Sequence, residues 1–433
     1  MATRTRGGSG KRTDWFVEDR FGMFIHWGLY SMPARHEWVK HRECMTDEQY
    51  QKYFDRFNPD LYEPREWARM AKAAGMKYFV ITTKHHEGFC LWDSKHTGYK
   101  ATNTPCRRDL LKEMVSAFRA EGLKVGFYYS LLDWHHPDFP VDKLHSQRDD
   151  KAFREREKNR DVRKYAEYMR KQVTELLTKF GKIDILWFDF SYPGEDGKGH
   201  KEWESEKLLK LIRKLQPDIM IDNRLDIPDS GDFETPEQFQ PTEGIKDKEG
   251  NPVVWEACQT FSGSWGYHRD EMSWREPAEL IATLIDCVSK SGNLLMNVGP
   301  TARGEFDYRV KERLAAYAEW MKRHDRSIYG CQQAPAEFKC PSGCKLTFNP
   351  VTNRLYLHIL SWPYKHITME GNAFTDHVEY AQFLHDGSEI AIKGLEAWQE
   401  ANHKLGGKNT LSITLPQMKP NVAIPVVELF LKK

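Results

Sequence analysis

Short apolar segments alternate with longer amphipathic ones over the first three quarters of the chain. The short segments have the length of strands and are almost continuously apolar, which is typical of parallel strands buried on both faces. The longer segments repeat apolar residues at helical spacing; one begins at the predicted N-cap Asp109. Strands are predicted over residues 21–27, 77–83, 124–130, 183–189, 219–223, 253–258 and 293–298, and helices over 110–121, 160–180, 202–215, 277–290 and 308–326.

This alternation predicts an α/β fold, either a (β/α)8-like barrel of TIM type with one strand degenerate, or a doubly wound sheet. No Gly-rich phosphate loop follows the first strand, which argues against a dinucleotide-binding domain. We expect a flexible leader over residues 1–13 and a catalytic barrel over 14–330.

The pattern changes after about residue 328. Pro, Gly and Asn now separate short alternating segments: 345–348, 354–360, 389–392, 410–415 and 422–431. Short strands of this kind with frequent turn residues are typical of a small antiparallel β-sandwich. We expect this second domain over residues 331–433.

Composition narrows the classes of partner. The 433 residues carry 64 Lys and Arg against 63 Asp and Glu, a net charge of +1, so no electrostatic argument favours nucleic acid or an anionic membrane. No apolar run is long enough to cross a bilayer, and no signal peptide is visible. We therefore expect no nucleic-acid or membrane partner. The compartment is left open, cytoplasmic or that of a secreted or periplasmic mature form with its signal removed. Oligomeric state is not predicted.

The cysteines do not suggest a metal site. The 8 Cys are scattered without a CxxC pair, and Cys340 and Cys344 have no second pair nearby. We expect neither a metal nor a cofactor.

Polar side chains follow the predicted barrel strands at their carboxyl ends. In a barrel these ends converge on one mouth, where the active site lies. The residues are His26 and Trp27, leading to Glu37 and Trp38; His85, His86 and Glu87; Tyr128, Tyr129 and Ser130; Trp187 and Asp189; Asp222, Asn223 and Arg224; and Trp255 and Glu256. Packing explains one such residue, but not a series of them on successive strands.

Each member also has a simpler interpretation. His85 and His86 could bind a metal, although adjacent His residues are not a typical ligand spacing. Asp189 could cap a following helix, and Arg224 could pair with Asp222 at the surface for little gain. Only the convergence of all these residues favours a site.

A mouth with carboxylates, His, Tyr and Trp and no cofactor motif suggests a polyhydroxylated neutral substrate. Glycoside hydrolysis requires two carboxyl groups, one of them kept protonated. Asp189 is one candidate. The second lies in the loop 230–241, which contains Glu234 and Glu237, or is Glu256.

Several segments together resemble the α-L-fucosidases of glycoside hydrolase family 29. They are residues 21–31, 37–38, 84–89, 126–130, 186–189, 255–256, 264–267 and 292–300, in family order. The resemblance implies a (β/α) barrel with a C-terminal β-sandwich, and hydrolysis of terminal α-L-fucose by an exo-acting enzyme. It also implies retention of configuration through a covalent fucosyl-enzyme and a fucosylated glycan as binding partner.

The family's residues can be placed on this chain one by one. Its strand-four nucleophile falls on Asp189, and the loop around Glu237 resembles one whose Glu is the acid/base, so Glu237 is preferred to Glu256 and Glu234. The predicted substrate-binding residues are His26, Glu37, Trp38, His85, His86, Tyr129, Trp187, Arg224, Glu256 and Trp265; Tyr128 is the alternative to Tyr129, because strand alternation exchanges the two. Two other functions are weighed, a fucose-binding protein without catalysis and a barrel glycosidase for another sugar such as galactose.

Overall fold

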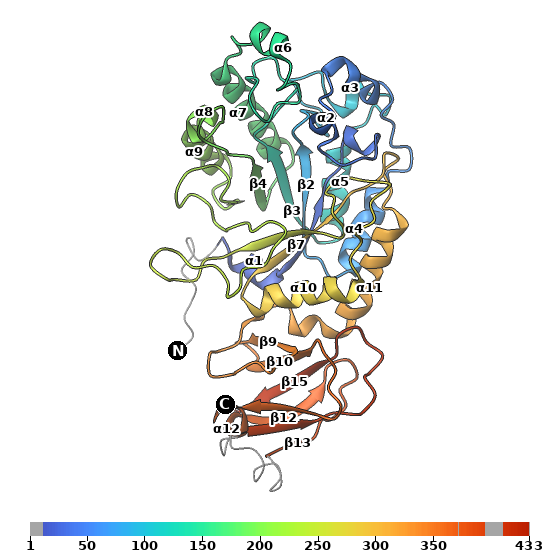
Figure 1. Cartoon of the computed structure of the whole chain (residues 1–433), viewed down its shortest axis with the longest axis vertical. Helices are drawn as coiled ribbons and strands as arrows, with labels where there is room; N and C mark the ends of the chain where they lie inside the picture. The colour runs from blue at the N-terminus through green and yellow to red at the C-terminus, as the bar shows by residue number, and fades with distance from the viewer. Residues whose placement is uncertain (1–11, 371, 395–409, 433) are drawn as a thin grey trace.

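The computed structural model describes residues 12–370, 372–394 and 410–432, and Figure 1 shows a barrel domain above a smaller β domain. The barrel sheet is parallel, with strand order β5-β4-β3-β2-β1-β7-β6. Its strands are β1 (Phe21–Ile25), β2 (Tyr78–Lys84), β3 (Lys124–Ser130), β4 (Ile185–Asp189), β5 (Met220–Ile221), β6 (Glu256–Thr260) and β7 (Asn293–Val298). Every strand predicted for this domain is therefore confirmed, and the doubly wound alternative is wrong because this sheet curls into a barrel.

Helices cover the outer face of this sheet or lie beyond the ends of its strands. They are α1 (Asp14–Asp19), α2 (Val39–Arg42), α3 (Asp47–Phe54), α4 (Pro64–Ala73), α5 (Leu110–Ala120), α6 (Lys151–Arg156), α7 (Val162–Lys179), α8 (His200–Trp203), α9 (Ser205–Leu215), α10 (Pro277–Ser289) and α11 (Tyr308–His324). Helix α1, for example, packs its Phe16 into the cluster of side chains inside the barrel. The predicted N-cap is confirmed, since the Asp109 side chain accepts from the Lys112 N–H. Short 3-10 turns are η1 (Leu29–Ser31), η2 (Ala101–Asn103) and η3 (Asp325–Ser327).

Both faces of the barrel strands are buried, but in different cores. Inward-pointing residues, among them Phe24, Tyr128 and Trp187, form one cluster inside the barrel. Their chain neighbours, such as Tyr129 and Phe188, point outward and pack under the helices. The inner and outer sets alternate along each strand, as the pleat requires.

An irregular segment fills the gap between the two edge strands, β5 and β6. The backbone of Phe233 forms a parallel β-bridge with Asp222. Glu234 forms one with Trp255, and Glu237 forms one with Cys258. The segment thus occupies the position of the degenerate strand and closes the barrel. It also brings Glu237 to the same end as the strand termini.

The β domain packs its own core between two antiparallel sheets, as predicted. The sheets have the orders β12-β15-β10-β9-β8 and β11-β14-β13. The elements are β8 (Gln332–Gln333), β9 (Cys344–Asn349), β10 (Arg354–Ile359), β11 (His366–Glu370), α12 (Asn372–His377), β12 (Val378–Phe383), β13 (Ile392–Lys393), β14 (Thr410–Thr414) and β15 (Val426–Leu431). Figure 1 shows α10 and α11 at the junction of the domains. The boundary at residue 330 stays a prediction.

The predicted leader falls almost wholly on residues 1–11, outside the described residues. Thr13, also assigned to it, is buried just before α1. None of the helices in the described part of the chain is long and apolar enough to cross a membrane.

Candidate active site

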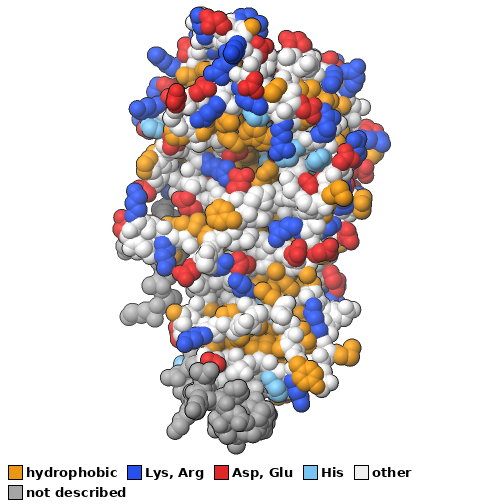
Figure 2. All heavy atoms as spheres, in the orientation of Figure 1, with side chains coloured by type: hydrophobic (Ala, Val, Ile, Leu, Met, Phe, Trp, Pro, Cys, Tyr) orange, Lys and Arg blue, Asp and Glu red, His pale blue; other side chains and the backbone are white. Residues whose placement is uncertain are grey.

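A cavity of about 440 Å³ opens at the carboxyl ends of the barrel strands. In Figure 2, hydrophobic, charged and histidine side chains meet around a recess in the upper half, the half that Figure 1 shows to be the barrel. The predicted site residues that line the cavity are His26, Glu37, Trp38, His85, His86, Trp187, Asp189, Arg224, Glu237 and Trp265. The structure therefore brings these side chains together from segments far apart in the sequence.

Asp189 is the last residue of β4, and its carboxylate is held from both sides. Tyr128 Oη donates to Oδ2 at 2.7 Å, and Arg224 Nη1 donates to Oδ1 at 2.7 Å. The next helix begins only at His200, so the helix-cap interpretation of Asp189 is wrong. Phe190 directly after it has a φ of 73°, a left-handed conformation that a bulky residue rarely adopts. This sharp turn leaves the Asp189 carboxylate at the cavity wall.

Arg224 joins the two candidate carboxylates. Its Nη1 binds Asp189 at 2.7 Å, and its Nη2 binds Glu237 at 2.8 Å. The guanidinium lies over the Trp187 ring, 4.4 Å from the ring centroid, and Nε donates to Thr235 Oγ1. Burial lowers the pKa of Arg224, but the Asp189 and Glu237 carboxylates outweigh burial and hold that pKa above its usual value. The interpretation of Arg224 as a surface partner of Asp222 is therefore wrong.

Three buried imidazoles face the cavity in their neutral form. Burial lowers the pKa of His26 to about 3 and that of His85 to about 4, and it also lowers the pKa of His86 well below 6.5. His26 Nδ1 lies 2.7 Å from Asn297 Oδ1, and His86 Nδ1 lies 2.6 Å from Ser130 Oγ. Neutral imidazoles suit hydroxyl groups better than anions. Within the described ranges, no His, Cys, Asp or Glu cluster is arranged to hold a metal ion.

Glu37 adds a buried charge to the cavity lining. Its Oε2 accepts from the Gly266 N–H at 2.8 Å, and Oε1 lies 3.0 Å from His36 Nδ1. Burial alone would raise the pKa of Glu37, but the His36 imidazole and the Gly266 N–H outweigh it and lower that pKa to about 2. Glu37 therefore presents an ionised carboxylate to the cavity at neutral pH.

The prediction of Tyr129 as a cavity residue is wrong. Tyr129 points outward, and its Oη donates to Gln172 Oε1 on α7 at 2.8 Å. Tyr128 points inward, lines the cavity and bonds to Asp189. Both residues are fully buried, so their hydrophobicity gives no indication of which one faces the barrel interior.

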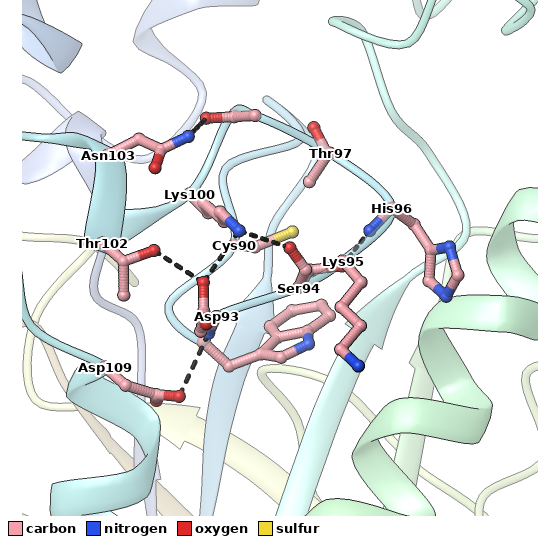
Figure 3. Close-up of polar contacts among 12 residues, drawn as sticks. Cys90, Asp93, Ser94, Lys95, His96, Thr97, Lys100, Thr102, Asn103 and Asp109 are labelled. Atoms are coloured by element: carbon pink, nitrogen blue, oxygen red, sulfur yellow. Dashed lines mark hydrogen bonds and ion pairs between the residues drawn. The ribbon is translucent and has the colours of Figure 1, made fainter.

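Tyr129 instead helps to hold the loop that follows His86. Gln172, its partner, also donates to Ser94 in this loop at 3.3 Å. Figure 3 shows the loop's own contacts: Asp93 accepts from Lys100 and Thr102, and Asp109 accepts from the Asp93 N–H. The carboxylate of Glu175 on α7 accepts from Trp92, Ser94 and the Lys95 N–H. These contacts fix the segment from which His85 and His86 reach the cavity.

The prediction of Glu256 at the mouth is also wrong. Glu256 begins β6 instead of ending a strand, and it is fully buried beneath the cavity. Tyr78 Oη, from the first residue of β2, donates to its Oε2 at 2.6 Å. Burial raises the pKa of Glu256 to about 8, so this carboxyl is a protonated floor group under Trp187. Glu234 binds Asn223 and lines a neighbouring cavity, which leaves Glu237 as the carboxyl beside Asp189.

Some cavity residues were not among the predicted catalytic or substrate-binding residues, although Asn223 was expected at the mouth. Phe24, Phe190, Ser191, Asn223, Asp226 and Cys258 also line the wall. Phe190 packs against Trp38 and His86, with ring centroids 5.1 and 4.7 Å apart. Phe190 could have been predicted from the sequence, because it is aromatic and directly follows Asp189. Cys258 could not, because the sequence does not show which face of its strand points into the barrel.

Comparison with known proteins agrees with this geometry. A family model described as Alpha-L-fucosidase matches residues 3–326. The chain belongs to the α-L-fucosidase family. The tissue α-L-fucosidase of Homo sapiens is 28% identical over 440 residues, covering 95% of this chain and 86% of that protein. The plasma α-L-fucosidase of Rattus norvegicus is 31% identical over 379 residues, covering 81% of this chain and 77% of that protein.

Solved structures of α-L-fucosidases share the fold. Isoenzyme 1 from Paenibacillus thiaminolyticus is 46% identical with a TM-score of 0.91, covering 98% of this chain and 99% of that one. An α-L-fucosidase from Bacteroides thetaiotaomicron, trapped as a covalent intermediate with 2-fluoro-fucosyl fluoride, is 29% identical with a TM-score of 0.84 and coverages of 100% and 98%. The predicted family and barrel fold are therefore confirmed.

Proposed function

We propose that this chain is a retaining, exo-acting α-L-fucosidase in which Asp189 is the nucleophile and Glu237 the acid/base. The observation that supports these roles is the Arg224 guanidinium, which holds both carboxylates at one wall of the cavity. A cavity of about 440 Å³ with an aromatic floor accommodates one terminal sugar better than a sugar in the middle of a glycan chain.

In the first step, Asp189 attacks the anomeric carbon while protonated Glu237 donates its proton to the leaving oxygen. Glu237 therefore has to leave Arg224 before it acts as an acid. Its side chain is 41% exposed, and the loop that bears it lies at the cavity rim, so the rotation is sterically open. In the second step, Glu237 removes a proton from the water that hydrolyses the ester on Asp189.

The other side chains of the cavity wall supply the groups that bind the sugar. His26, His85 and His86 are neutral hydrogen-bonding groups for ring hydroxyls, and Glu37 is a charged acceptor. Phe24, Trp187 and Trp265 offer apolar surface for the C6 methyl of fucose. The ligand that fits these groups is a terminal fucose of a glycan.

The test of the nucleophile uses an aryl α-L-fucoside with Asp189→Asn and Asp189→Gly. Both variants should lose turnover by a factor of about 10³ or more, whereas turnover close to wild type would remove Asp189 from this role. An aryl β-D-galactoside, assayed in parallel, distinguishes a fucosidase from a galactosidase. Absence of turnover with retained fucose binding in the wild type would support the fucose-binding alternative.

The acid/base requires a second test. Glu237→Ala should slow substrates with poor leaving groups far more than activated ones, and azide should restore the rate by capturing the fucosyl-enzyme. Glu234→Ala and Glu256→Ala are the matched controls. The assignment is wrong if azide rescues either of these variants instead.

A further inference from the structure

Behind His85 lies a buried carboxyl group that the proposed mechanism does not use. Glu87 is 1% exposed and does not line the cavity. The Gly88 N–H donates to the His85 carbonyl at 3.0 Å, so residues 85–88 form a tight turn that places Glu87 behind the His85 ring. Gly28 leaves the space for the carboxyl, because a Cβ there would lie 3.0 Å from Glu87 Oε1.

The facing atoms of these two side chains are otherwise unsatisfied. His85 Nδ1 and Glu87 Oε2 are 3.4 Å apart. Each is buried, and neither forms a hydrogen bond of ordinary geometry with any residue that the structure describes, so each is the nearest available partner of the other. A buried polar atom without a partner is costly, so one proton has to lie between the two atoms. It belongs either to a neutral Glu87, which then donates to Nδ1, or to His85, which then donates to a carboxylate.

The surroundings favour the neutral carboxyl. The two nearby ammonium groups are already paired, Lys40 with Asp47 at 2.6 Å and Lys84 with Asp133 at 3.0 Å. An ionised Glu87 would therefore be a buried charge without its own counter-ion, which is unfavourable. The other ionisable groups around it are Tyr30, Tyr50 and Tyr99. Burial raises the pKa of Glu87 to about 8, consistent with this environment.

We propose that Glu87 is a positioning residue whose protonated carboxyl donates to His85 Nδ1 and thereby fixes the tautomer of His85. His85 Nε2 then carries the ring proton and presents a hydrogen-bond donor to the substrate. This inference deepens the proposed function and rests on it, because the donor matters only if a sugar hydroxyl occupies the cavity.

His26, which lies next to His85 in the cavity lining, has the opposite tautomer. Asn297 Nδ2 donates to the Trp265 carbonyl at 2.6 Å, which turns Asn297 Oδ1 towards His26. His26 Nδ1 must therefore donate to that oxygen at 2.7 Å, and its Nε2 is an acceptor. The ring centroids of His26 and His85 are 5.5 Å apart. A sugar hydroxyl between them accepts from His85 and donates to His26, so the two imidazoles fix the direction of its hydrogen bonds.

The direct test is ¹⁵N NMR of the histidine-labelled enzyme, with the His85 signals assigned by His85→Gln. At pH 6.5 we expect Nε2 protonated and Nδ1 bare. Above pH 8, as Glu87 ionises, the proton should move to Nδ1 in the wild type but not in Glu87→Gln, whose amide N–H replaces the carboxyl donor. A protonated Nδ1 at pH 6.5 overturns the proposal. This measurement needs no turnover, so it tests the effect of Glu87 on the His85 tautomer even if the proposed enzymatic function is wrong.

Kinetics with an activated aryl α-L-fucoside, whose leaving group needs no proton from Glu237, supply the second readout. The wild type should lose about tenfold in kcat/KM between pH 6.5 and 9, the value of one hydrogen bond. Glu87→Gln should stay within about threefold of the wild type at pH 6.5 and lack the alkaline loss, whereas Glu87→Met should be reduced at both pH values. Glu256→Gln is the matched control, because burial raises the pKa of Glu256 to about 8 as well. An alkaline loss that persists in Glu87→Gln and vanishes in Glu256→Gln contradicts the proposal.

Discussion

Tyr128 and Tyr129 are adjacent and equally buried, yet they should respond oppositely to loss of the hydroxyl. Tyr128 Oη donates to Asp189 Oδ2 at 2.7 Å inside the barrel, whereas Tyr129 Oη donates to Gln172 at 2.8 Å outside it. Tyr128→Phe should therefore impair catalysis, and Tyr129→Phe should affect mainly stability. The pair is a matched control, since both changes remove one hydroxyl from the same strand.

The expected loss follows from the charge on Asp189. The carboxylate is neutralised in the fucosyl-enzyme ester and regains its charge as the ester is hydrolysed. The Tyr128 hydrogen bond is therefore stronger at the second transition state than in the intermediate, and only such differential interactions change the rate. A hydrogen bond to a charged group contributes about 1.5–3 kcal/mol, which corresponds to a loss of roughly 10- to 150-fold in kcat for Tyr128→Phe.

Stopped-flow release of the aryl leaving group separates the two steps. Tyr128→Phe should show a burst close to one equivalent, because deglycosylation becomes limiting, with a smaller loss in kcat/KM than in kcat. Tyr129→Phe should keep kcat within about twofold and lose about 1 kcal/mol of unfolding free energy. The reasoning is refuted if Tyr128→Phe retains wild-type kcat, or if Tyr129→Phe shows the burst.

Three further changes test other parts of the structure. Gly266→Ala would place a Cβ 3.0 Å from that of Glu37, so kcat/KM should fall about tenfold or more through displacement of this carboxylate; unchanged kinetics would contradict the geometry. Glu175→Ala should lower the free energy of unfolding, measured by denaturant titration, by about 2–4 kcal/mol, because Trp92 and Ser94 lose their acceptor. Lys179→Met, which removes a partly exposed ammonium that contacts Glu175 and the Asp93 carbonyl, should cost under about 1 kcal/mol. Burial lowers the pKa of His358 to about 3, below its unfolded value of 6.5, so its contribution to stability is complete above pH 6.5 and is lost as the pH falls towards 3. His358→Gln should therefore show a smaller drop in melting temperature from pH 7 to 5 than the wild type, and equal drops would argue against this pKa.

The irregular segment 233–237 shows where sequence patterns lose information. It has too few apolar residues in alternation to be predicted as a strand, and only isolated bridges tie it to β5 and β6. Its position nevertheless determines that Glu237, and not Glu256, is the carboxyl near Asp189. Strand ends were the other weak point, because Glu256 was expected at the end of its strand and lies at its beginning. Local pattern places a strand on the chain, but it does not fix the residue at which the strand begins or ends.

The sequence by itself determined the order of strands and helices, the change to a β-sandwich and the position of Asp189 at the end of a buried strand. These features depend on local periodicity and turn residues, which can be recognised in short stretches of sequence. Tertiary structure alone decided that Tyr128 faces inward, that Arg224 joins Asp189 to Glu237, and that Glu256 is a floor group. The physical reason is that both faces of a barrel strand are apolar and buried, so hydrophobicity cannot distinguish the inside from the outside until the sheet closes.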